Sequence, residues 1–465
     1  MTFDATSGTG WYGVSVSLFE DNSLVSFSQS VVHISVDNYI DDDLIDNNAR
    51  IGLALPIGGG FGWGTIGYQL AQVLTLDSEN DVVFLREVHG GTMTERERKM
   101  VESGIANSIG VAGGAGGAGG AGGAGGGCLP FTVIHALGKF PALDTMGKIL
   151  SGGSGQVVGV KNVGILFAET AEWSESEIAS LDFFDRVFVG SSWGKSMLVK
   201  AGFAEEKLGV FLQGVDKTVF GVGRGDAEGM GMDDRGLTET LRKMVSGKFV
   251  IFSGGKLERR KGQDIVLAAF KHFAKMHDDV FLLTNWQNDW VETVKGIDEG
   301  GVGVVGVPEY DAGRGGLMIN EWMRDNGVEG GSALDVGRQT QGMLGRLVRE
   351  FVDVGVFVSR CEGGTNLVLM ETIGGGKLCI VGEGTGMVDV VEKICENGGC
   401  IVVGMGQGKG KGKEEGWREA KVADVVAEME KVYVMGKEEL GKIGRKGGEL
   451  MWEWEVELHK MLEQI

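Results

Sequence analysis

Two glutamates stand on either side of a glycine turn in the segment Arg360-Cys-Glu-Gly-Gly-Thr-Asn-Leu-Val-Leu-Met-Glu371. An ionised carboxylate only accepts hydrogen bonds, and two neighbouring sugar hydroxyls donate two of them. Glu362 and Glu371 are therefore suited to bind sugar diols. The same two acids would also be favoured at the positive end of a helix without any ligand, and their spacing alone does not decide between these interpretations.

The residues that follow this turn predict a helix over 367–373, with Thr365 or Asn366 as its N-cap. The first turn of a helix leaves backbone N–H groups without partners inside the helix. A strand, a glycine turn and a helix start therefore concentrate donors at one point. Such a point binds anions or hydroxyl-rich groups.

A second group of candidate residues is basic. Lys256 and Lys261 flank a turn in the segment Gly254-Gly-Lys-Leu-Glu-Arg-Arg-Lys-Gly262, directly before a predicted helix. Two ammonium groups beside helix N–H donors suit a diphosphate leaving group, whose developing charge must be neutralised in the transition state. The alternative is a solvated basic loop.

A glycine-rich loop at 58–64 lies between a predicted strand at 50–56 and a predicted helix at 65–74. This arrangement again makes a cradle for a polar ligand. A dinucleotide site would need an acid at the end of the second strand. The candidate strand at 82–85 is followed by both a basic and an acidic residue, so the dinucleotide interpretation stays open.

A lone histidine, His135, comes near the end of an apolar strand predicted over 131–138. Ligands of open parallel sheets bind at the carboxyl ends of the strands, so His135 is placed to reach a cleft. The alternative is a structural histidine at a strand end.

Short apolar runs alternate with helical segments along most of the chain, which predicts an α/β protein with parallel sheets. Further strands are expected at 163–167, 186–189, 210–213, 249–253, 280–284, 354–359 and 378–381, and helices at 193–201, 264–276 and 343–351. From residue 417 onward the pattern is helical.

The stretch Glu362-Gly-Gly-Thr-Asn-Leu-Val-Leu-Met-Glu371, followed by small residues and Lys377, resembles the signature of group 1 (family 4-like) retaining glycosyltransferases. The sequence Glu-Gly-Gly-Thr-Asn-Leu-Val is similar to the motif of a subgroup in which the two glutamates lie one residue further apart than in most of the family. The resemblance covers residues 130–435 well and 50–75 loosely. It implies the GT-B fold, in which two Rossmann-like doubly wound domains face a cleft.

The resemblance also implies roles for single residues. Glu371 would hold the ribose diol of a nucleotide-sugar, and Glu362 its hexose. The implied catalytic set is His135, Lys256, Lys261 and Glu362. The implied donor-binding set is Gly62, Gly64, Gly255, Lys256, Lys261, Glu362, Gly363, Gly364, Thr365, Asn366, Leu367 and Glu371. No protein nucleophile is required if the leaving phosphate deprotonates the acceptor.

Four positions depart from the family pattern. The family usually has arginine at Lys256, and the subgroup has proline at Leu378, asparagine at Gly384 and histidine at Met387. The alternative function is therefore a degenerate GT-B homologue that binds nucleotide or glycan without turnover. A third interpretation, a dinucleotide-dependent oxidoreductase that rests on the glycine loop, leaves the lysine pair unexplained.

The expected organisation has five parts. They are an N-terminal extension (1–49), an N-terminal Rossmann-like acceptor domain (50–220) with a flexible Gly/Ala insertion (112–127), a linker (221–246), a C-terminal nucleotide-sugar domain (247–435) and a C-terminal helix that crosses back (436–465).

Composition limits the partners. A formal net charge of −21 argues against a nucleic acid and against an anionic membrane surface. The expected partners are a nucleotide-sugar donor and a glycan, lipid or small-molecule acceptor. Beyond the donor we expect no cofactor, and no metal.

Five cysteines, an odd number without C-x-x-C spacing, favour a reducing compartment over a disulfide scaffold or a zinc site. No apolar run has the length of a bilayer span, and the N-terminus lacks a signal-peptide pattern. A cytoplasmic protein is expected.

Overall fold

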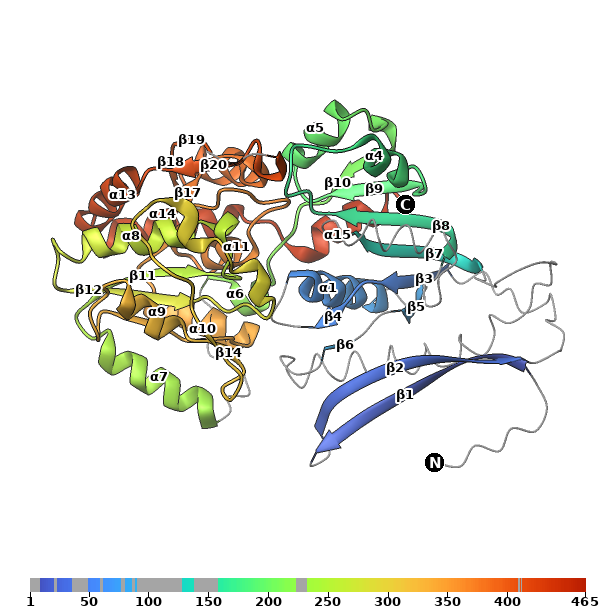
Figure 1. Cartoon of the computed structure of the whole chain (residues 1–465), viewed down its shortest axis with the longest axis horizontal. Coiled ribbons are helices and arrows are strands. Elements are labelled where there is room, and N and C mark those ends of the chain that lie inside the picture. Colours follow the sequence, from blue (N-terminus) through green and yellow to red (C-terminus); the bar gives the residue numbers. More distant parts are fainter. Residues whose placement is uncertain are drawn as a thin grey trace.

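The computed structural model describes residues 9–20, 23–35, 49–58, 62–76, 80–85, 88–89, 128–137, 158–222, 232–408, 410 and 412–465. The predicted Gly/Ala insertion at 112–127 lies outside these ranges. Within them, two six-stranded parallel sheets form the cores of two α/β domains, which lie side by side in Figure 1. No helix of the described ranges is long and apolar enough to cross a bilayer.

Six parallel strands form the sheet of the first domain, in the spatial order β10-β9-β8-β7-β3-β5. They are β3 (Ala49–Ala54), β5 (Asn80–Phe84), β7 (Cys128–Leu137), β8 (Val158–Leu166), β9 (Arg186–Val189) and β10 (Leu208–Val210). The helical segments of this half are α1 (Gly62–Leu76), α4 (Glu175–Leu181), α5 (Ser192–Lys200), η3 (Glu205–Lys207) and α6 (Lys217–Phe220). The strands predicted between residues 50 and 189 are confirmed, whereas the one predicted at 210–213 lies earlier, as β10.

The sheet of the second domain has the spatial order β15-β12-β11-β16-β17-β18. Its strands are β11 (Phe249–Gly254), β12 (Val280–Asn285), β15 (Ala333–Asp335), β16 (Val354–Phe357), β17 (Leu378–Gly382) and β18 (Ile401–Val403). The chain changes direction along the sheet between β11 and β16. Such a switch point leaves a crevice at the carboxyl ends of the strands, where ligands bind in open α/β sheets.

Helices cover both faces of the second sheet. They are α7 (Met232–Met244), α8 (Gln263–Phe273), α9 (Ile319–Asp325), α10 (Gln341–Phe351), α11 (Leu367–Gly374), α12 (Val388–Val390), α13 (Val422–Val434) and α14 (Lys437–Leu450), followed by α15 (Trp454–Leu462). Shorter turns are η4 (Arg259–Lys261), η5 (Val291–Thr293), η6 (Ile297–Gly300), η7 (Thr385–Met387), η8 (Val391–Cys395) and η9 (Gly412–Glu414). Helix α7 lies inside the predicted linker, and the domain boundaries stay a prediction.

Four short strand pairs complete the described chain. The strands β1 (Thr9–Glu20) and β2 (Ser23–Ser35) form an antiparallel hairpin, drawn at the bottom of Figure 1. The other pairs are β4 (Ile57–Gly58) with β6 (Val88–His89), β13 (Tyr310–Asp311) with β14 (Gly316–Leu317), and β19 (Met405–Gln407) with β20 (Arg418–Ala420). The helical pattern predicted from residue 417 is therefore wrong at β20 and confirmed after it.

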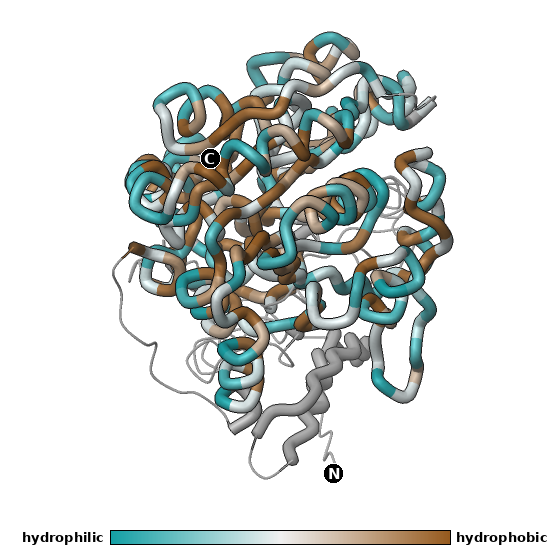
Figure 2. Tube along the Cα trace, turned by 90° about the vertical axis from the view of Figure 1, so that its left-hand side faces the viewer, coloured by the Kyte–Doolittle hydropathy of each residue, from teal (hydrophilic) through white to brown (hydrophobic). Residues whose placement is uncertain are grey.

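The second sheet is buried on both faces, which explains its continuous apolar strands. Ile251 packs on one side with residues of α8 and α13, while Val250 and Phe252 pack on the other side with residues of α10 and α11. Figure 2 shows apolar segments running through the interior and polar ones at the periphery.

The last helix leaves the second domain and packs against the first. Trp454, Leu458 and Met461 of α15 are buried in one cluster with Leu70 of α1. The backbone N–H of Val215 donates to the carbonyl of Trp452, 3.0 Å away, at the crossing point. A second connection therefore joins the two domains near the end of the chain.

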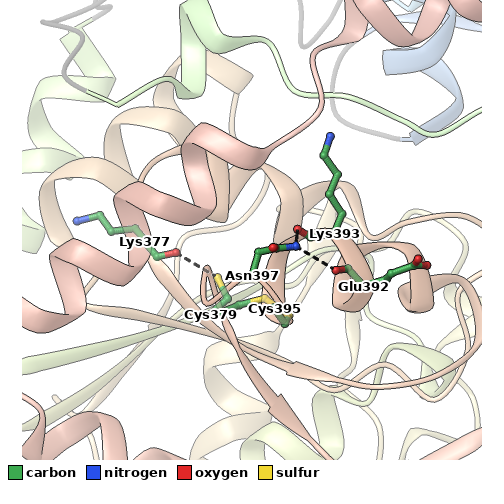
Figure 3. The surroundings of a disulfide bond; sticks show 7 residues. Lys377, Cys379, Glu392, Lys393, Cys395 and Asn397 are labelled. Carbon is green, nitrogen blue, oxygen red and sulfur yellow. Dashed lines mark hydrogen bonds between the residues drawn. A yellow bond between two sulfur atoms is a disulfide. The ribbon is translucent and has the colours of Figure 1, made fainter.

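A disulfide joins Cys395, the last residue of η8, to Cys400, the residue before β18. Figure 3 shows the surroundings of this bond. The cysteine count favoured a reducing compartment over a disulfide scaffold, and this single bridge was not predicted. A spacing of five residues is no recognised motif. The tight turn between η8 and β18 nonetheless brings the two Cα atoms to 4.4 Å, within the range that a disulfide needs. Cys361 and Cys379 are buried thiols that take no part in this disulfide.

Arg360 fastens the loop after β16 to the start of α8. Its Nη1 and Nη2 donate to the two carboxylate oxygens of Asp264 at 2.7 and 2.8 Å, and its Nε donates to Glu419 at 2.9 Å. Nη1 also donates to the carbonyl of Arg259. The side chains of Arg360 and Asp264 are 2% and 0% exposed, so neither charge has water as an alternative partner.

We expect Arg360→Met to destabilise the protein by roughly 3–5 kcal/mol, because it leaves the Asp264 carboxylate buried without its cation. Urea denaturation measures this loss. Arg242→Met, at an arginine that is 61% exposed, is the matched control and should change the stability by no more than about 0.5 kcal/mol. Equal losses in the two variants would contradict the assignment.

Candidate active site

A cleft of about 820 Å³ lies between the two domains, at the carboxyl ends of β11, β12 and β16. The first domain contributes the start of α1 and Phe167, and the second contributes the loops that follow its strands. This volume falls in the range of small-molecule sites. The switch point of the second sheet therefore faces the first domain across a space that accommodates a ligand.

The turn Glu362–Asn366, called the signature turn below, leads into α11. Asn366 is the N-cap: its side-chain oxygen accepts from the backbone N–H of Leu369 at 3.2 Å, and its Nδ2 donates to Glu362 at 2.9 Å. Thr365 instead donates to Gln213 of the first domain at 3.1 Å. Of the two N-cap candidates, the structure selects Asn366.

The two glycines of the signature turn lie against the backbone of the first domain. A Cβ built on Gly363 would lie 2.6 Å from the carbonyl carbon of Phe167. A Cβ built on Gly364 would lie 3.3 Å from the Cα of Gly190 and closer still to the Phe167 ring. Ser191, the N-cap of α5, donates to the carbonyl of Gly363 at 3.2 Å. Side chains at these positions would therefore push the domains apart.

Glu362 is the centre of a buried polar cluster. Its Oε1 and Oε2 lie 2.8 and 2.7 Å from the Nζ of Lys261, and Oε2 also accepts from Arg260 at 3.0 Å. Ser359 and Asn366 donate to Oε1 at 2.7 and 2.9 Å. Burial lowers the pKa of Lys261, although the neighbouring carboxylate acts in the opposite direction. The charges of Lys261 and Glu362 thus depend on each other.

A second set of charges extends the cluster across the cleft. Arg260 pairs with Glu258 at 2.6 Å and with Glu169 of the first domain at 2.9 Å. Burial opposes the charge of Arg260, but the carboxylates around it raise its pKa. Burial likewise opposes the charge of Glu258, yet Arg260 and Lys256 lower its pKa to about 2. Arg260 and Glu258 are therefore both charged at neutral pH.

Lys256 stands at the rim of this cluster. Its Nζ pairs with Glu258 at 2.5 Å and lies 4.4 Å from the ring centroid of Trp290, a cation–π distance. Its side chain remains 32% exposed, so it faces the cleft and is accessible to a ligand.

Glu371 lines the cleft one helical turn beyond the signature turn. Its Oε1 accepts from the side-chain amide of Gln341 at 3.1 Å. Burial raises the pKa of Glu371 to about 8, because the loss of water disfavours the charged form of its carboxyl group. Without ligand this side chain is therefore mostly protonated at neutral pH.

Most of the predicted site residues meet in this cleft, and two do not line it. The predicted residues among its lining are Gly62, Gly255, Lys256, Lys261, Glu362, Gly363, Gly364, Thr365, Asn366, Leu367 and Glu371. Gly64 is buried in α1. His135 is buried as well, with Nε2 3.1 Å from the Oδ1 of Asn162 and its ring against Phe184. The roles assigned to all of them stay predictions.

Sequence reasoning missed Arg260, Glu258 and Glu169. Glu258 and Arg260 belong to the basic segment 254–262. The doublet Arg259-Arg260 beside Lys261 could have indicated a further cation at the site. Glu169 follows a strand of the other domain, so nothing local indicated its partner. Trp63, packed edge-on against Phe167 at 4.9 Å, was also missed as part of the cleft wall.

Comparisons of the whole structure reveal similar proteins. Sucrose-phosphate synthase from Thermosynechococcus elongatus matches over 89% of this chain and 98% of its own, with 14% identity and a TM-score of 0.56. A glycosyltransferase from Rickettsia africae matches over 90% of this chain and 98% of its own, with 13% identity and a TM-score of 0.55. HepE from Anabaena, solved with UDP and glucose, matches over 89% of this chain and 98% of its own, with 12% identity and a TM-score of 0.53.

The sequence itself matches no protein-family model and no curated protein. Identities of 12–14% show a shared fold and nothing finer. Together with the two parallel sheets, they confirm the predicted GT-B architecture of two Rossmann-like domains.

The raised pKa of Glu371 predicts a pH dependence of stability. Between about pH 4.5 and 8 the folded protein keeps a proton on Glu371 that the unfolded chain releases, so the free energy of unfolding falls as the pH rises through this interval. This group contributes a slope of up to about 1.4 kcal/mol per pH unit.

Glu371→Gln should remove that contribution, as measured by urea denaturation across the same pH interval. The exposed Glu396→Gln is the control and should keep the slope of the wild type. An identical slope in Glu371→Gln and wild type would show that the Glu371 carboxyl is ionised in the folded protein.

Proposed function

We propose that this protein is a retaining glycosyltransferase that moves a sugar from a nucleotide-sugar to a hydroxyl acceptor. The observation that carries the proposal is the meeting of Lys256, Lys261, Glu362 and Glu371 in one cleft, at the switch point of a Rossmann-like sheet. HepE, which has the same fold, was solved with UDP-glucose, and the neighbour from Rickettsia africae is a glycosyltransferase by name. These neighbours support the class of reaction.

In this proposal each group has a role that fits its position. Glu371 binds the ribose diol as a carboxylate, so donor binding must release the proton that it holds without ligand, and Gln341 donates to its Oε1. Lys256 and Lys261 neutralise the diphosphate as the bond between sugar and phosphate breaks, which is where preorganised cations lower the barrier most. The leaving phosphate accepts the proton of the acceptor hydroxyl on the same face of the sugar, so no protein nucleophile is needed.

Donor binding must rearrange the charges of the cluster, because Lys261 and Glu362 are already partners at 2.7 Å. A diphosphate that takes Lys261 as its partner would release hydrogen-bonding capacity on the Glu362 carboxylate. The released oxygen can then accept from the hexose hydroxyls. Arg260, Ser359 and Asn366 keep Glu362 in place during this exchange.

The acceptor side of the cleft belongs to the first domain in this proposal. The start of α1 presents Trp63 and Ile66 to the cleft, beside Phe167. An aromatic and apolar wall of this kind offers one face to the carbon skeleton of an acceptor ring. The acceptor hydroxyl would then approach the face of the sugar that carries the leaving diphosphate, as retention requires.

The direct test is release of nucleotide from a panel of UDP-, GDP- and ADP-sugars, without and with candidate acceptors. Wild type should turn over one donor of the panel. Lys261→Ala should lower that rate by roughly 10²–10³, the loss expected for a donor that stabilises developing charge. Lys243→Ala, at a lysine that is 75% exposed on α7, should keep the wild-type rate.

Two outcomes would separate the alternatives. No turnover of any donor, with nucleotide binding that Glu371→Ala abolishes, would assign the protein to the non-catalytic binding proteins. Turnover that is insensitive to Lys261→Ala would contradict the proposed site. Stereochemical analysis of the product by NMR distinguishes retention from inversion.

Lys256 stands where the family resemblance places an arginine, and this gives a further prediction. Lys256→Arg should bind the nucleotide several-fold more tightly than wild type, because a guanidinium fork can meet two phosphate oxygens while still stacking on Trp290. Lys256→Met should bind it more weakly. Titration calorimetry with the nucleotide measures both, and the reverse order of affinities would exclude a phosphate contact at this position.

A further inference from the structure

A second cavity, of about 640 Å³, lies at the opposite end of the second sheet. Asp353 directly precedes β16 and Lys377 directly precedes β17, and both line this space, which we call the back cavity. The interdomain cleft lies at the carboxyl ends of the same strands. Because β16 has four residues and a strand rises about 3.3 Å per residue, roughly 13 Å of sheet separates the two sites.

The charged residues around the back cavity are predominantly basic. Its lining contains four cations and two carboxylates: Arg349, Lys377, Lys437, Arg445, Glu350 and Asp353. Four minus two gives a local excess of two positive charges, in a chain whose formal net charge is −21. The charge of this cavity is therefore opposite in sign to that of the whole protein.

Glu350 makes its ion pairs with residues outside the cavity, whereas Asp353 partly offsets the charge of Lys437 within it. Glu350 already pairs with Arg346 at 2.6 Å and with Arg242 at 3.2 Å, and neither arginine lines the cavity. Asp353 accepts from the backbone N–H of Val250 at 2.8 Å and lies 3.4 Å from Lys437.

Two of the cations are fixed in place by neutral groups. Lys377 donates to the carbonyl of Arg349 at 2.9 Å, and Arg349 donates to the carbonyl of Val219. A hydrogen bond to a carbonyl orients a cation without neutralising it. Burial lowers the pKa of Lys377, so an anion beside it would restore a favourable environment for its charge.

The third cation, Arg445 of α14, reaches the cavity along its own helix. Its guanidinium lies over Gly441, where a built Cβ would be 3.1 Å from Nη1, and Gly441 lines the cavity. The absence of a side chain at Gly441 leaves this guanidinium next to open space. A planar fork of this kind suits the oxygens of a phosphate group.

We propose that the back cavity binds a small phosphate-bearing metabolite, with the phosphate held by Lys377, Lys437 and Arg445. The cavity volume is in the range of small-molecule sites, and Val352, Leu378 and Leu440 supply an apolar wall for the rest of the ligand. The site is separate from the interdomain cleft and does not depend on the glycosyltransferase assignment.

The test uses inorganic phosphate as the probe, titrated calorimetrically into the full-length protein, with sodium chloride of matched ionic strength as the reference. Wild type should bind phosphate beyond the chloride reference. Arg445→Gln and Lys437→Gln should each weaken that binding about tenfold or more, the effect of losing one charge-assisted hydrogen bond. Both residues are exposed, so the fold should survive the change, and circular dichroism checks it.

Lys446→Gln is the matched control, because it removes the same charge from the neighbouring position of α14 without touching the cavity. It should bind phosphate as wild type does. Binding that Lys256→Gln abolishes and Arg445→Gln leaves intact would place phosphate in the interdomain cleft and overturn the proposal. Wild type that binds phosphate no better than chloride would overturn it as well.

Discussion

A buried charge in this cleft is stable only next to an opposite charge. Glu362 provides that opposite charge for Lys261 and Arg260. Its two oxygens accept from Lys261, Arg260, Ser359 and Asn366, so the basic loop after β11 and the turn after β16 hold each other in position. The proposed donor site uses the same groups. In that proposal the binding site and the internal support of the second domain are built from one set of charges.

The contact between the domains rests on the same set. Arg260 reaches Glu169 of the first domain, whose backbone carbonyl also accepts from the indole of Trp417 at 3.0 Å. The glycines of the signature turn permit this approach because they place no side chain against Phe167 and Gly190. Ion pairing and close backbone packing thus act at one interface. A ligand that competes for Lys261 or Arg260 would also change how firmly the two domains are held together.

Much of the fold follows from local pattern. Continuous apolar runs such as Phe249–Ser253 are typical of strands buried on both faces, and the sheets confirm them. The sequence indicated an N-cap at Thr365 or Asn366, since both side chains are short and polar and precede a helical run, and the structure selects Asn366. The disulfide between Cys395 and Cys400 was not visible, because it depends on the path of a turn and not on a motif.

The sequence alone indicated which short segments meet at the cleft: the two lysines after β11 and the two glutamates around α11 were all predicted, and all line it. Only the tertiary structure decided which charges pair. Lys261 and Glu362 are 101 residues apart in the chain, and Arg260 and Glu169 belong to different domains. His135 was expected at the cleft from its strand, yet it is held by Asn162 inside the first domain. Local pattern specifies helices, strands and caps because these depend on near neighbours, whereas the pairing of buried charges depends on which strand ends the folded sheets bring together.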